Sequence, residues 1–79
     1  MGRMVKIGNM TIRVNGNDHL TAHFHVITPD HEGLVAIKTL ALFRGALPAQ
    51  VLVSALQWAK VNHDALIAEW NAWNPRHPV

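Results

Sequence analysis

The strongest constraint on the fold is a change of hydrophobic period between Gly45 and Pro48. Before this point, short runs alternate between apolar and polar residues, which predicts β-strands; after it, apolar residues recur at helical spacing. Strands followed by helices are typical of an α+β domain. Because the chain has 79 residues and no cysteine, it fits one domain, 1–79, without disulfides or a thiolate metal site.

Residues 1–45 are expected to form a small, mainly antiparallel sheet of four to five strands with a histidine-rich turn and strand. A hairpin over 5–14, turning at Gly8-Asn9, would place its charged side chains in solvent. A continuous helix across 34–43 competes with the last two strands, but β-branched residues and flanking glycines favour strands. The strands expected after the hairpin are 23–27, 34–37 and 40–44.

Residues 48–73 are expected to form two helices on one face of the sheet. A single helix would be about 39 Å long at ~1.5 Å per residue, more than the roughly 25–30 Å that a domain of this size should span. Asn62-His63-Asp64 offers a break at which Asn62 can cap the second helix and His63 can cap or pack. Residues 74–79 are expected to be a flexible tail. The apolar arc of the helical wheel comprises Val51, Leu52, Ala55, Leu56, Trp58 and Ala59, and the pattern resumes with Leu66, Ile67, Trp70 and Trp73.

Three of the six histidines fall between positions 19 and 25, where a turn is expected to become a strand. Along 23–27, alternation places Phe24 and Val26 in the core and presents His23 and His25 together on the opposite, wetter face. The candidate binding residues are Asp18, His19, His23 and His25.

A metal site is one interpretation of this cluster. The Cα atoms of His23 and His25 would lie roughly 6.5–7 Å apart on one face of the strand. Two imidazoles so placed can converge on zinc or a similar divalent ion, with His19 or Asp18 as the third ligand.

Metal-free chemistry is a second interpretation, because histidine titrates near neutral pH and can move protons. With Arg13, Lys38 or Arg44 nearby, such a site could cleave or hold RNA. The third interpretation is structural: the histidines donate hydrogen bonds to loop carbonyl oxygens or lie under a partner protein. In this interpretation Asp18 only orients His19 within the turn. The residues leave open whether the chain is an enzyme.

Net charge and hydropathy restrict the possible functions less than the histidine cluster does. A formal net charge of +2 permits an acidic partner or nucleic acid without demanding either. No apolar run is long enough to span a bilayer and no secretory signal is evident, so a cytoplasmic domain without membrane contact is expected. Trp58 and Trp70 are expected in the core, while Trp73 is the tryptophan considered for an interface.

The segment from Asp18 to Val26, DHLTAHFHV, resembles a small prokaryotic family known as domain-of-unknown-function family 4160. The resemblance also covers residues 6–8, 12–14 and 45–48, together with Trp58, Leu66 and Trp70-Asn71. It implies a compact α+β domain, often encoded beside another small domain in pairs that look like toxin–antitoxin systems. It supplies no activity or catalytic residue.

The predicted role is therefore a protein-interaction component of a toxin–antitoxin-like two-gene system. The expected partner is a small protein encoded nearby or a second copy of the chain. The alternative is a histidine-based enzyme or a domain that binds a metal such as zinc, acting on RNA.

Overall fold

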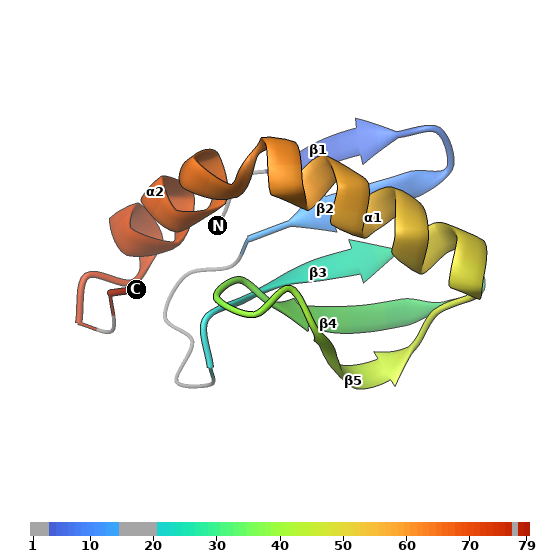
Figure 1. Cartoon of the computed structure of the whole chain (residues 1–79), viewed down its shortest axis with the longest axis horizontal. Coiled ribbons are helices and arrows are strands. Elements are labelled where there is room, and N and C mark those ends of the chain that lie inside the picture. The colour runs from blue at the N-terminus through green and yellow to red at the C-terminus, as the bar shows by residue number, and fades with distance from the viewer. Residues whose placement is uncertain (1–3, 15–20, 77) are drawn as a thin grey trace.

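The computed structural model describes residues 4–14, 21–76 and 78–79, and it is an α+β domain. A five-stranded antiparallel sheet is followed by two C-terminal helices (Figure 1). This architecture confirms the predicted fold class. The elements are β1 Met4–Ile7, β2 Met10–Arg13, β3 His23–Ile27, β4 Glu32–Ala36, β5 Leu42–Ala46, α1 Ala49–Val61 and α2 His63–Trp73.

The sheet is a meander in which the strands lie side by side in chain order, from β1 to β5. Short turns connect most neighbouring strands, and Gly8 supplies the left-handed φ of +60° that the β1–β2 turn needs. The last two strands begin two residues from where the sequence predicted them, at Glu32 and Leu42. The register between these two strands shifts at Leu34 and Val35, which marks a β-bulge.

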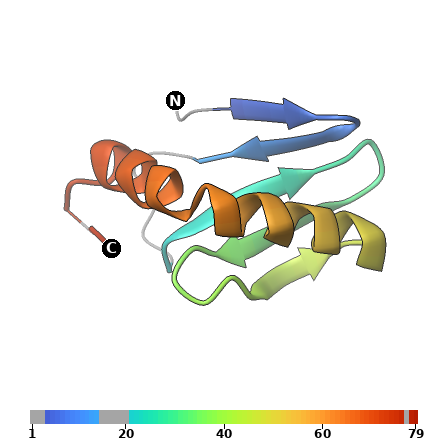
Figure 2. The same ribbon diagram turned by 45° about the horizontal axis from the view of Figure 1, so that its top comes forward.

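Both helices lie on the same side of the sheet, as two views of the ribbon show (Figures 1 and 2). The core fills the space between the two layers. Phe24 and Val26 of β3 are fully buried there, as alternation predicted, and Ala55 and Ala59 let α1 approach the strands closely. Trp70 anchors α2 and is also fully buried.

The break between the helices lies at Asn62, so the prediction of two helices is confirmed. The predicted side-chain cap is wrong, because the Asn62 Nδ2 donates backwards to the Trp58 carbonyl oxygen at 2.9 Å. His63 packs at the break as expected. Its Nε2 donates to the carbonyl oxygen of Ile37 at 2.6 Å and so ties the start of α2 to the turn that follows β4.

The residues after α2 contact that helix. Asn74 is buried, and its Nδ2 donates to the Trp70 carbonyl oxygen at 3.1 Å. The backbone N–H of Val79 donates to the Asn71 Oδ1 at 2.7 Å. The predicted flexibility of this tail stays a prediction, but the contacts give it a defined docking position.

Candidate functional site

The face of the sheet that the helices leave open carries the candidate site; we call it the helix-free face. The strand register places Arg13, His25, Leu34 and Arg44 directly opposite one another across β2, β3, β4 and β5. We call these four residues the cross-strand row. Arg13 and Leu34 are half-buried, His25 is largely buried and Arg44 is exposed, so a binding partner would meet the Arg44 end of the row most directly.

Charge is distributed unevenly within the described sheet. Its strands contain one acidic residue, Glu32, against three Lys or Arg residues, namely Lys6, Arg13 and Arg44. The register places all of them on the helix-free face. The strands therefore present a basic surface, which favours contact with an anionic group.

His23 lies on this face of β3, but the prediction that it is exposed is wrong. Its side chain is only 1% exposed. The ring packs against the rings of Trp70 and Phe43, with centroids 5.5 and 5.7 Å away. The Nδ1–H donates to the Thr21 carbonyl oxygen at 2.6 Å. Alternation predicted the correct face for His23. It could not predict the burial of the ring, because Trp70 of α2, which covers it, comes from a distant part of the chain.

His25 is the accessible histidine of the pair, although its side chain is only 13% exposed. Its Nδ1 donates to the Glu32 Oε2 at 3.1 Å. The two histidine rings are 5.1 Å apart between centroids. The predicted adjacency of His23 and His25 is therefore present, with an acidic partner on one ring.

The tautomers of both rings follow from these bonds. A carbonyl and a carboxylate can only accept, so Nδ1 carries the proton in His23 and in His25. In each neutral ring the lone pair is then on Nε2. The bond at Nδ1 fixes the orientation of each ring.

The other two candidate residues, Asp18 and His19, lie outside the described residues. Within the part of the chain that the structure describes, no group of three or more His, Cys, Asp or Glu side chains could hold a metal ion. His23 and His25 supply two ligands, so a metal site formed by His19, His23 and His25 stays a prediction.

The basic residues expected near the histidines are placed differently from one another. Arg13 lies directly opposite His25, and Arg44 lies in the same row. Lys38 lies in the turn that follows β4. The Arg13 Nε is a buried donor without a hydrogen-bond partner among the described residues. Because a buried charged donor normally has an acceptor, this atom marks a position suited to an anion.

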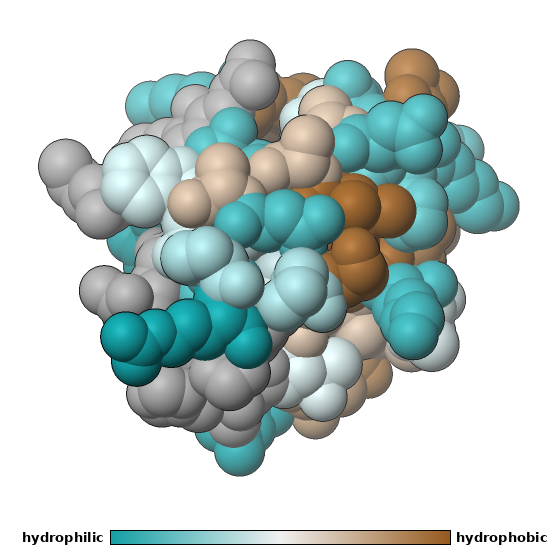
Figure 3. All heavy atoms as spheres, turned by 90° about the vertical axis from the view of Figure 1, so that its left-hand side faces the viewer, coloured by the Kyte–Doolittle hydropathy of each residue, from teal (hydrophilic) through white to brown (hydrophobic). Residues whose placement is uncertain are grey.

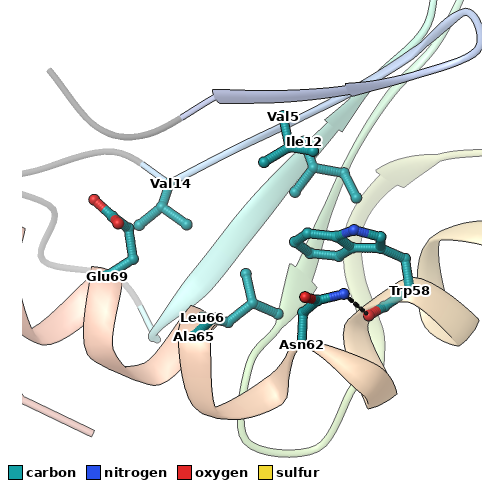
Figure 4. A pocket seen from close by; sticks show the side chains of 8 residues that line it. All are labelled: Val5, Ile12, Val14, Trp58, Asn62, Ala65, Leu66 and Glu69. Carbon is teal, nitrogen blue, oxygen red and sulfur yellow. Dashed lines mark hydrogen bonds between the residues drawn. The ribbon is translucent and has the colours of Figure 1, made fainter.

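A small hollow lies on the opposite side of the sheet, between the β1–β2 hairpin and the two helices (Figure 4). Trp58 and Asn62 form one wall, and Ile12 and Leu66 line the apolar part. Its volume of about 60 Å³ is well below the ~300–1,000 Å³ of ordinary ligand pockets. A second hollow adjoins the β1–β2 turn and the start of α1. Neither contains His23 or His25.

The end of the molecule that carries α2 is mostly hydrophilic, with a small strongly hydrophobic group in the middle (Figure 3). Trp73, considered from sequence for an interface, is 41% exposed, and its Nε1 donates to the Glu69 carboxylate. The indole is thus held against its own helix, and the helix-free face is the better candidate for an interface.

Three contributors to the site were missed from sequence. Glu32 falls outside the predicted strand 34–37, yet a paired hairpin over 23–36 would have placed it diagonally opposite His25. Phe43 and Trp70 cover His23. For these two the sequence holds no local signal, because a β-bulge and a helix packing angle decide where they lie.

Fold and site together define a small α+β domain with a basic, histidine-containing sheet face. The model of a family described as a domain of unknown function, DUF4160, matches residues 10–71, and the chain belongs to this family, as its sequence resemblance indicated. Comparison with curated proteins and with solved structures finds no match. Among the described residues, neither helix has the length and apolar character required to cross a membrane.

Proposed function

We propose that this domain is an interaction module that binds a small protein partner through its helix-free face. The observation that carries the proposal is the cross-strand row, which brings two arginines, a histidine and a leucine together on the face that the two helices do not cover. A sheet packed on one side only usually turns polar side chains to water on the other. Here that face also keeps apolar groups, and such a mixture suits a protein interface.

The apolar part of this surface consists of Ile27, Leu34 and Phe43. Ile27 and Leu34 are half-buried, and Phe43 is 40% exposed. They lie among Arg13 and Arg44, so a partner would meet both apolar and cationic groups. Charge complementarity selects an acidic partner surface.

The setting proposed for this binding is a prokaryotic, cytoplasmic two-gene system of the toxin–antitoxin type. This setting is what the sequence resemblance to the family implies, namely a domain encoded beside another small domain.

Co-expression with the product of the neighbouring gene tests the proposal. Arg44→Glu should reduce recovery of the complex strongly, because it reverses a charge at the exposed end of the row. Lys60→Glu is the matched control, since it makes the same charge change on the exposed side of α1 and should leave the complex intact. Failure of the wild-type chain to form any complex would contradict the proposal.

A histidine-based reaction on RNA is the second candidate, and the His25–Glu32 bond favours it. A carboxylate that holds Nδ1 orients the ring, as carboxylates hydrogen-bonded to reactive histidines do. If RNA is the substrate, cleavage by protein purified without an affinity tag should be lost in His25→Ala and reduced in Glu32→Gln. Metal analysis of the same preparation tests the zinc interpretation. Full cleavage by His25→Ala would exclude this role for the histidine.

A further inference from the structure

We infer that Arg13 is the anchor for a carboxylate in an extended, acidic segment of the partner protein. The inference rests on the proposed function and names the chemistry that the helix-free face recognises. Two features carry it, namely the buried Nε of Arg13, which has no hydrogen-bond partner among the described residues, and the position of this residue in the cross-strand row.

The Arg13 Nε is buried within the fold and has no hydrogen-bond partner among the described residues. Removing an arginine donor from water without an acceptor destabilises the folded state, and natural structures normally supply one. A carboxylate bound side-on accepts from Nε and from one Nη together, which is the geometry that arginine favours. Because the Nε is buried, the Arg13 side chain would turn outward as a carboxylate binds, and the carboxylate would then satisfy the donor that the described fold leaves unpaired.

The described strands offer Arg13 no counter-ion of their own. Their only acidic residue is Glu32, and its carboxylate accepts from the Nδ1 of His25 at 3.1 Å. Arg13 faces Met4 across the β1–β2 pair and His25 across the β2–β3 pair, and neither cross-strand neighbour is an anion. The missing charge is thus expected from outside the sheet.

The spacing of the row favours an extended peptide. Arg13 and Arg44 are three strand intervals apart, or about 14 Å at ~4.8 Å for each interval. In an extended segment, side chains four residues apart on one face are separated by about 13–14 Å. Acidic residues at positions i and i+4 would therefore reach the two arginines, with an apolar residue at i+2 between His25 and Leu34.

Single-stranded nucleic acid fits this surface less well. Such ligands are usually held by several aromatic side chains on which successive bases stack. On the helix-free face, His23 is buried and Phe43 is the one large aromatic residue of the described strands that is exposed. An apolar residue between two carboxylates matches Leu34 better than a sugar–phosphate backbone does.

The side-chain Nε–H signal of Arg13 in ¹⁵N-labelled full-length protein gives a direct test by NMR. The probe is a synthetic peptide Thr-Glu-Thr-Leu-Thr-Glu-Thr, and the control peptide replaces both glutamates with glutamine. We expect a saturable downfield shift of the Arg13 signal with the acidic peptide and none with the control. Arg13→Lys should weaken peptide binding by about tenfold or more, because lysine keeps the charge but cannot donate two parallel hydrogen bonds to one carboxylate.

Arg13→Met separates recognition from folding. It should abolish the peptide response while leaving the thermal midpoint unchanged or raised, because it removes an unpaired buried donor. A large fall in the thermal midpoint would overturn the inference, since it would make Arg13 a structural residue. The inference would also be overturned if the Asp18→Asn variant, without peptide, showed a shifted Arg13 signal, because Asp18 would then be an internal counter-ion of Arg13. A response to a uridine oligonucleotide but not to the peptide would overturn it in favour of RNA.

The partner protein separates this inference from the function on which it rests. If Arg13→Lys leaves the affinity for the partner unchanged while Arg44→Glu abolishes binding, the anchor is wrong and the interaction module stands. If neither substitution weakens the complex, both are wrong.

Discussion

Neighbouring residues of one strand point to opposite faces of the sheet, and the two faces differ in the kind of side chain that they carry and in its burial. On the helix-covered face, Phe24, Val26 and Val35 are fully buried among apolar neighbours. On the helix-free face, the register aligns Arg13 and Arg44 with His25 and Leu34. Hydrophobic burial stabilises the fold on one side, whereas the other side carries charges that contribute little to stability and suit recognition.

His23 is the exception to this division. It points to the helix-free side of β3, yet it is 1% exposed because Trp70 of α2 reaches its ring. The same tryptophan belongs to the core cluster on the covered side. Trp70 therefore couples the two faces, and the accessible chemistry of the histidine pair is concentrated on His25.

The largest expected effect comes from Phe24→Ala on the covered face. Removing a fully buried aromatic ring should lower the free energy of unfolding by about 3–5 kcal/mol, enough to unfold much of a marginally stable domain. Urea denaturation followed by tryptophan fluorescence measures it. Leu34→Ala on the other face is the control, because its half-buried side chain should cost only about 1 kcal/mol. Equal losses would contradict the division between the faces.

Gly45→Ala should have the next largest effect, at the edge of the sheet. Gly45 has φ +76°, and an added Cβ would lie 2.2 Å from the Glu32 carbonyl oxygen, so β4 and β5 would have to separate locally. We expect a loss of about 2–3 kcal/mol in thermal or urea denaturation. Gly8→Ala provides the comparison, since Gly8 also has positive φ but nothing within 4 Å of the added atom. It should cost only about 1 kcal/mol.

Local pattern predicted most of the fold. Alternation in 23–27 identified the buried pair Phe24 and Val26, and the change of period near Pro48 placed two helices after the sheet. Both signals arise within a few residues, so a single sequence suffices to read them. The strand bounds were less accurate at Glu32 and Leu42, where the turns decide the register.

The site was less predictable, because its parts come together only in three dimensions. Alternation gave the face of His23 but not the ring of Trp70 that covers it from 47 positions along the chain. The His25–Glu32 bond depends on a hairpin register that neither segment encodes alone. Arg13 was expected in solvent, whereas its Nε is buried.

His63→Ala should lower the free energy of unfolding by about 1–2 kcal/mol, because it leaves the Ile37 carbonyl oxygen without its 2.6 Å bond. This bond joins α2 to the covered side of the sheet, so the effect belongs to stability alone. At a temperature well below the unfolding midpoint, where the variant is fully folded, its affinity for the partner should not change. A loss of partner affinity in folded His63→Ala would extend the functional surface beyond the helix-free face.

Glu32→Gln should have the smallest effect on stability and a visible one on binding. Its carboxylate is 53% exposed and pairs with His25 at 3.1 Å, and such exposed pairs contribute only about 0–1 kcal/mol. Glutamine can still accept from the His25 Nδ1 through its amide oxygen, so the ring keeps its orientation. The substitution removes the only acidic residue of the described strands, and affinity for an acidic partner should rise about two- to fivefold at low salt. Calorimetry at two salt concentrations measures this, and Glu69→Gln on α2 is the matched control. If the increase in affinity is the same at high salt, the partner does not recognise the charge of the helix-free face.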